Sequence, residues 1–448
     1  MIIDFLLLFC LGVFAISNVI APFCFALAYV WVDMFYPQYV SYNILTNAPV
    51  SMIFGLLMLM FYVLADRKIM PKVPGLLTLY GLMGIWISVT TLNAVVPAAA
   101  AIKYNAAITV LLVAAFLPFV INTRVRIEAV LMVMLFASSA HILPWGIKTI
   151  ISGGGYQKAL GLVGVNGIAL SESSMMADFV FFAIPMFFYL AQHNVVLSLS
   201  PKPRRYLFWG LSLIFAVGAF GSFARTGLVT MGVVLVGYFL RSKRKLLFLP
   251  LVAVLAGGLV VASSGWKDRM ETMTDYQNEG SAETRVIVWK WAWEFAQQHP
   301  LGGGFEAYLV QDITTSHLGA DGQPIHVVRR AFHSIYFADL AEHGYPGILI
   351  FLSIVAASFL ALHRTRKQTR DRQDLLWAHD LAGHLQIGLA AMLAGDAFID
   401  PSFYPILWYP MAMVLCLRSV VIRALGAPAP QFAEPRLQPE AALLSPMV

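Results

Sequence analysis

Two arginines and one histidine in the second half of the chain have the surroundings that an anion-handling site needs. The first, Arg225, lies in Gly221-Ser-Phe-Ala-Arg-Thr-Gly227, between two apolar runs that both end in basic clusters. One helix over residues 206–240 would be about 52 Å long, against a hydrocarbon core of about 30 Å. We therefore predict a hairpin with Arg225 at its turn. An arginine there is costly unless it is paired or lines a wet cavity. This favours ligand binding over the alternative, in which it snorkels to lipid headgroups.

The second arginine, Arg285, lies in a stretch whose spacing predicts a helix from Ser281 to His299, closed by Pro300. Arg285 falls on the apolar face of this helix rather than on the polar one. That apolar face is formed by Val288, Trp289, Ala292 and Ala296. Because tryptophans suit a helix lying on a membrane surface, we expect Arg285 to point inward, toward the bundle or a lipid headgroup. The alternative is a structural salt bridge.

The histidine, His333, stands where a polar loop enters the next apolar run, in Arg329-Arg-Ala-Phe-His-Ser-Ile-Tyr336. A histidine can take a proton from a hydroxyl near neutral pH. Its neighbours Arg329, Arg330 and Tyr336 are further candidate contacts for a substrate. The alternative is a hydrogen-bonded residue at the membrane interface. Three other histidines lack metal-ligand spacing: His299, His317 and His326.

The composition places these residues in a membrane protein. Of 448 residues, 59% are hydrophobic and 12% charged, and the mean hydropathy is +0.74, whereas ordinary globular chains carry about 25% charge. Runs of about 20 apolar residues recur and do not alternate as barrel strands do. The predicted fold is an all-α polytopic bundle of about 12 transmembrane helices. The cysteines lie in apolar runs and indicate neither a disulfide nor a metal site.

The apolar runs divide the chain into four predicted regions. Residues 1–263 form about ten spans, 264–333 a large polar loop with an amphipathic helix, 334–426 the last spans, and 427–448 a disordered tail. The expected spans lie near 3–16, 19–36, 47–65, 74–92, 104–121, 127–146, 174–192, 206–223, 226–240, 246–263, 334–362, 378–398 and 405–423.

Basic residues predict the orientation of the bundle. Of the 30 Lys and Arg, 20 fall in loops on one side, which the positive-inside rule makes cytoplasmic. They are topology determinants rather than a nucleic-acid patch. The large loop then faces the periplasm, and the tail the cytoplasm. Ten basic residues lie on the outer face, among them Lys103, a further candidate contact. An anionic ligand or anionic headgroups would explain them.

Several motifs follow one another in an order typical of one family. They are Ser222-Phe-Ala-Arg-Thr-Gly227, Thr284-Arg285 with its tryptophan-rich helix, His299-Pro-Leu-Gly-Gly-Gly-Phe305, His333-Ser-Ile-Tyr336 and Glu342-His-Gly-Tyr-Pro-Gly347. From about residue 205 to 362 the chain resembles the O-antigen ligase and polymerase superfamily, and its ligase-like branch most. At residue 172 the chain has Glu-Ser-Ser, where the family pattern has an acid followed by asparagines.

The resemblance implies a function for each of the three candidates. Family ligases move a glycan en bloc from undecaprenyl pyrophosphate to a sugar hydroxyl of lipid A–core, without a metal or cofactor. Arg225 and Arg285 would hold the donor pyrophosphate and His333 would be the catalytic base, or would only orient the acceptor. Polymerisation of lipid-linked units and O-glycan transfer to protein remain open, with the same donor. A secondary transporter is the alternative from another class.

Overall fold

The computed structural model describes residues 2–152, 169–222, 224–242, 280–318 and 324–427, and these are almost entirely helical. The helices are α1 (Ile2–Ile20), α2 (Cys24–Phe35), α3 (Pro37–Val40), α4 (Val50–Leu64), α5 (Pro74–Leu92), α6 (Pro97–Val120), α7 (Arg124–Ser152), α8 (Ser173–His193), α9 (Pro201–Gly221), α10 (Arg225–Arg241), α12 (Gly280–Gln298), α13 (Ile335–Thr369), α14 (Leu376–Gly395) and α15 (Pro405–Leu425). Short 3-10 turns lie at Ala169–Ser171, Ala307–Val310 and Gln373–Leu375.

The helices confirm a multi-pass α-helical membrane protein. Six of them are long and apolar enough to cross a membrane: α5, α6, α7, α8, α13 and α15. Three shorter apolar helices lie in the first 64 residues. The expected spans at 206–223, 226–240 and 378–398 coincide with α9, α10 and α14, which all pack against α8. The expected span at 246–263 lies outside the described residues, so the total of 12 stays a prediction.

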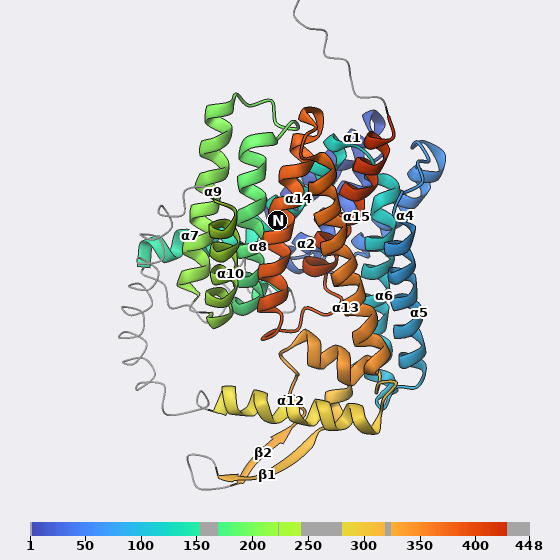
Figure 1. Ribbon diagram of the computed structural model, residues 1–448, viewed down its shortest axis with the longest axis vertical. Helices are drawn as coiled ribbons and strands as arrows, with labels where there is room; N and C mark the ends of the chain where they lie inside the picture. The colour runs from blue at the N-terminus through green and yellow to red at the C-terminus, as the bar shows by residue number, and fades with distance from the viewer. Residues whose placement is uncertain (1, 153–168, 223, 243–279, 319–323, 428–448) are drawn as a thin grey trace, which may run out of the picture.

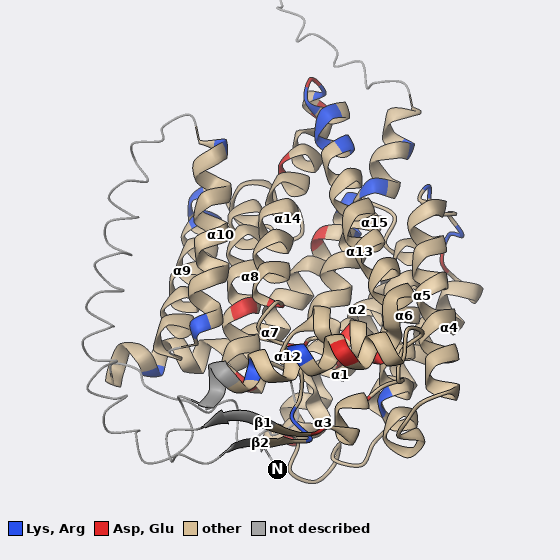
Figure 2. Ribbon diagram, turned by 60° about the horizontal axis from the view of Figure 1, so that its bottom comes forward, with Lys and Arg blue, Asp and Glu red and all other residues tan. Residues whose placement is uncertain are grey.

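The bundle has two chemically different ends. At the first, which we call the basic end, α10, α13 and α15 finish with Arg241, with Arg366 and Lys367, and with Arg423. Figure 2 shows basic residues gathered there. The opposite end, which we call the loop end, carries α12 and a small sheet (Figure 1). This separation agrees with the charge pattern of the sequence, while the membrane side of each end stays a prediction.

Helix α12 lies across the loop end, and its borders confirm the helix predicted from Ser281 (Figure 1). Val288, Ala292 and Ala296 are almost fully buried, whereas Lys290 and Glu294 are exposed. The buried face packs on Phe332 and on the first turns of α13, in a small core separate from that of the bundle. The apolar face of α12 is therefore buried against α13, and this packing fixes the position of Arg285 on the helix.

A two-stranded hairpin follows α12, which the polar sequence of this loop did not predict. Strand β1 (Asp312–Leu318) pairs with antiparallel β2 (Pro324–Val328), with Asp312 opposite Val328. Val327 is buried in the same small core as Val288. The hairpin thus ties the end of α12 to the segment that leads into α13.

A glycine-rich segment anchors the loop onto a kink in α13. The N–H of Gly303 donates to the carbonyl of Ala341 (2.9 Å) and the N–H of Gly304 to that of Glu342 (2.8 Å). At the kink, Gly344 has a φ of 66°, and a Cβ there would overlap the carbonyl of Pro300. The motifs 299–305 and 342–347 are therefore two halves of one backbone contact.

Candidate functional site

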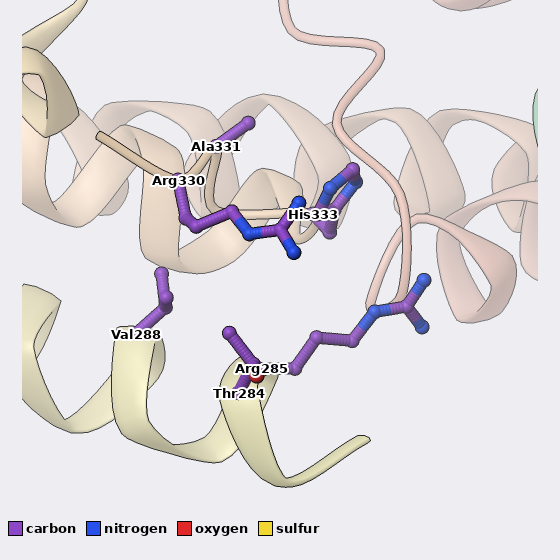
Figure 3. Close-up of a pocket in the computed structure, with 6 residues that line it drawn as sticks. All are labelled: Thr284, Arg285, Val288, Arg330, Ala331 and His333. Carbon is purple, nitrogen blue, oxygen red and sulfur yellow. The ribbon is translucent and has the colours of Figure 1, made fainter. Parts of the chain in front are cut away.

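A pocket at the loop end brings together two of the predicted residues and one further candidate. It is lined by Arg285, Arg330 and His333, with Thr284, Val288 and Ala331. Figure 3 shows Arg285 extending from α12 on one side and Arg330 and His333 from the loop on the other. The pocket is thus bordered by two guanidinium groups and an imidazole, a set suited to an anion next to a proton acceptor.

Arg225 is the first residue of α10, as the hairpin predicted for residues 206–240 requires. The turn is tight because Gly221 packs directly on Thr149 of α7, and a Cβ at Gly227 would lie 3.0 Å from Ala177 of α8. Ala224, the residue before α10, makes no side-chain cap hydrogen bond among the described residues. Since the dipole of a helix attracts anions to its N-terminus, Arg225 and the helix end favour negative charge at the same place.

Arg285 and Arg225 lie close enough to act on each other electrostatically. Burial lowers the pKa of Arg285 and the positive charge of Arg225 lowers it further, while Glu172 opposes both effects. Within the described part of the chain, Arg285 has no carboxylate at ion-pair distance. The structural salt bridge is therefore not found there, and Glu172 acts on Arg285 only through space.

The backbone around His333 is held from two sides. Nε1 of Trp289, one turn along α12 from Arg285, donates to the carbonyl of Phe332 (2.9 Å). On the other side, the N–H of Ile335 donates to the carbonyl of Asp396 (2.9 Å). His333 itself has a φ of 48°, a left-handed conformation that costs about 1–2 kcal/mol. The contacts of its neighbours hold it there, so α12 positions Arg285 and His333 together.

His333 is half-buried, and its charge state is set by its neighbours. Burial lowers the pKa of His333, as do the positive charges of Arg285 and Arg330, while Asp400 raises it. The imidazole is therefore neutral at pH 7, the form that accepts a proton. Asp400, in the connection between α14 and α15, is placed to stabilise the charged form once a proton arrives.

The two neighbouring arginines differ in position. Gln311, which is buried, bonds to the backbone of both. Its backbone carbonyl accepts from the N–H of Arg329 (3.1 Å), and its side-chain Oε1 accepts from the N–H of Arg330 (3.1 Å). Both side chains are exposed, but Arg330 lines the pocket and Arg329 does not.

The remaining two candidates lie outside the pocket lining. The hydroxyl of Tyr336 donates to the carbonyl of Leu393 (2.7 Å), within the bundle. Nζ of Lys103 lies 4.9 Å from the ring centre of Tyr404 and interacts electrostatically with Asp400. Lys103 is therefore linked to His333 through Asp400 rather than directly.

Three residues of the site carry little signal in the sequence. Gln311 lies in a polar stretch, and Asp400 follows the apolar run at 378–398 without a motif around it. Glu172 departs from the family pattern only in the residues after it; burial raises its pKa, and the positive charge of Arg285 offsets part of that rise. Among the described residues no group of three or more His, Cys, Asp or Glu could hold a metal ion.

A comparison with protein families finds a match that covers most of this site. Residues 210–352, which contain Arg225, Arg285, Arg330 and His333, match the family model described as O-antigen ligase. This part of the chain is therefore similar to the O-antigen ligase family. The match confirms the resemblance seen in the motifs and indicates a glycosyltransferase of the ligase or polymerase type.

The rest of the comparison adds the first half of the chain. Residues 2–195 match a family of unknown function, DUF5935, and this matched segment contains Lys103 and Glu172. No curated protein matches the chain. The site therefore draws on both families, since Glu172 acts on Arg285 across their boundary.

Proposed function

We propose that the protein is an O-antigen ligase-type glycosyltransferase. It moves a glycan en bloc from undecaprenyl pyrophosphate to a sugar hydroxyl of lipid A–core, at the periplasmic face of the bacterial inner membrane, by metal-independent transfer with inversion. The observation that carries the proposal is the convergence of Arg225, Arg285 and His333 at one end of the bundle, within an O-antigen ligase domain.

The two arginines bind the donor. A pyrophosphate carries dense negative charge and accepts paired guanidinium bonds. Burial lowers the pKa of Arg285 and the positive charge of Arg225 lowers it further, and an anion bound between the two arginines offsets both effects. As the bond from the anomeric carbon to the pyrophosphate oxygen breaks, charge grows on that oxygen. The arginines and the α10 N-terminus offset this charge in place of a metal.

His333 acts on the acceptor. Its neutral imidazole takes the proton of the acceptor hydroxyl while that oxygen attacks the anomeric carbon, and the pyrophosphate leaves from the opposite face. Direct displacement of this kind inverts the configuration at the carbon. The negative donor counteracts the arginines, so donor binding raises the pKa of His333 and makes it a stronger base.

The loop end faces the periplasm in this account, because the basic end takes the cytoplasmic side. The partners are the lipid-linked glycan, the lipid A–core acceptor and membrane lipids, with no nucleic acid.

An in vitro transfer assay tests this proposal. Purified protein is incubated with undecaprenyl-pyrophosphate-linked glycan and rough lipopolysaccharide, with EDTA present, and products are separated on a glycan-stained gel. We expect one glycan-plus-core band, lost in Arg225→Ala, Arg285→Ala and His333→Ala. Arg329→Ala is the matched control, because Arg329 does not line the pocket.

The other outcomes lead to the alternatives. A ladder formed without acceptor indicates a polymerase, and transfer only to a protein acceptor indicates a protein O-oligosaccharyltransferase. A product that disappears with EDTA contradicts metal independence. No product from any donor, with folded protein, favours the transporter, for which the buried carboxylates Asp178 and Asp396 would be the first candidates.

A further inference from the structure

Two arginines at the basic end converge on one helix. Arg241 ends α10 and Arg366 lies in the last turn of α13, and both helices pack against α14. Nη2 of Arg241 donates to Oε1 of Gln386 (2.7 Å), and Nη1 of Arg366 approaches the same oxygen at 3.4 Å. One amide oxygen therefore lies within reach of two positive charges.

A glycine lets them come this close. Nη1 of Arg241 donates to the carbonyl of Gly383, where a Cβ would lie 3.1 Å from that nitrogen and 3.6 Å from Nε of Arg366. A Cβ at 383 would crowd Nη1 of Arg241, so glycine allows this close approach to α14. The convergence is therefore built into the packing of three helices.

The arginine pair lacks the negative partner that other basic residues at this end have. Arg124, Arg126 and Arg372 each pair with a carboxylate. In the described part of the chain, Arg241 and Arg366 have none at ion-pair distance, and Nε of Arg366 is buried without a hydrogen-bond acceptor. Asp380, on the same helix as Gly383, is held by His193 at 2.7 Å. Two like charges and a buried unpaired donor are costly unless an anion satisfies them.

We propose that Arg241 and Arg366 form a binding site for the phosphate group of an anionic phospholipid in the leaflet that the basic end faces. A phosphate has several oxygens and bridges two guanidinium groups whose nitrogens already reach one common atom. The positive-inside rule accounts for arginines at this end, but not for their turning inward onto α14. Basic pockets between transmembrane helices suit such headgroups. The site is remote from the pocket at the loop end and does not depend on the proposed transfer.

Lipid binding to the whole, delipidated protein tests this site. Native mass spectrometry would count retained lipids after addition of phosphatidylglycerol or phosphatidylcholine, and thermal unfolding would be followed with each lipid and with inorganic phosphate. We expect wild-type protein to retain phosphatidylglycerol in preference and to be stabilised by it. Arg366→Gln and Arg241→Gln each remove charge-assisted bonds and should weaken this binding about tenfold or more.

The matched control is Arg370→Gln, an exposed arginine one turn beyond Arg366 at the end of α13. Equal retention of both lipids by wild-type protein, which needs no variant to fold, overturns the proposal. So does a loss of binding in R370Q as large as in R366Q. Stabilisation by inorganic phosphate alone, lost in R241Q and R366Q, supports the phosphate site but assigns it to a soluble phosphate.

Discussion

At the scale of single residues, the site is an electrostatic balance around His333. Burial lowers the pKa of His333, the positive charges of Arg285 and Arg330 lower it further, and Asp400 acts in the opposite direction. In the proposed function the same arginines attract the donor, and its negative charge cancels their effect on His333. Donor binding would then make His333 a stronger base.

The pH dependence of transfer should follow this balance. Activity requires neutral His333, so it falls as the pH drops through the pKa of that residue, which lies below the usual value of 6.5. Arg330→Gln removes a positive charge and should move this acid limb to higher pH, by about half a unit to one unit. Asp400→Asn should move it to lower pH.

The measurement is kcat/KM for transfer against pH, with Arg329→Gln as the control that leaves the limb in place. An acid limb that does not move in R330Q or in D400N means that another group is the base.

The sequence predicts some of these residues and not others. Arg225, Arg285 and His333 stand out because a charged or titratable side chain interrupts an apolar pattern. Gln311 and Asp400 do not, since their roles exist only once β1 and the α14–α15 connection are folded against the 329–333 segment. Tyr336 was expected beside His333, but its hydroxyl bonds to α14.

At the scale of elements, α12 sets the position of Arg285 relative to the segment 330–333. Its apolar period predicts its buried face, and Ser281 and Pro300 predict its borders. The sequence does not predict the hairpin of β1 and β2, because its residues are mostly polar. The contact between the two glycine motifs is also invisible in their spacing, because it joins backbone groups rather than side chains.

This backbone contact has glycine at positive φ at three positions, Gly302, Gly304 and Gly344. Gly344→Ala and Gly304→Ala place a side chain at positive φ and against a neighbouring segment, which should destabilise the loop end by at least about 1–3 kcal/mol. Limited proteolysis within residues 299–333 should become faster, and thermal unfolding should begin earlier. Gly210→Ala, in α9 with nothing near its Cβ, is the control. Equal protease resistance in G344A and wild type would show that this contact does not hold the loop.

At the scale of the whole molecule, the apolar runs predict the class and most spans, since each run must cover the hydrocarbon core. They do not predict which helices touch, because neighbours are selected by shape and not by hydropathy. Expected spans at 104–121 and 127–146 are longer in the structure, as α6 and α7, and α6 starts early because Pro97 suits a first helical turn.

The orientation can be measured with single cysteines. In a Cys10→Ala background, where Cys24 and Cys416 are buried, Lys290→Cys on α12 is exposed at the loop end and Arg370→Cys at the basic end. A membrane-impermeant maleimide should label K290C in spheroplasts and label R370C only after the membrane is opened. The reverse pattern would put the loop end in the cytoplasm and exclude transfer in the periplasm.

The most direct test of the central claim separates donor binding from transfer. Binding of undecaprenyl pyrophosphate to purified protein would be measured for wild type, Arg225→Gln, Arg285→Gln and His333→Ala, alongside transfer by the same samples. We predict donor binding about tenfold or more weaker in each arginine variant, and nearly normal binding without transfer in H333A. Unchanged binding in the arginine variants, or full transfer by H333A, would contradict the account.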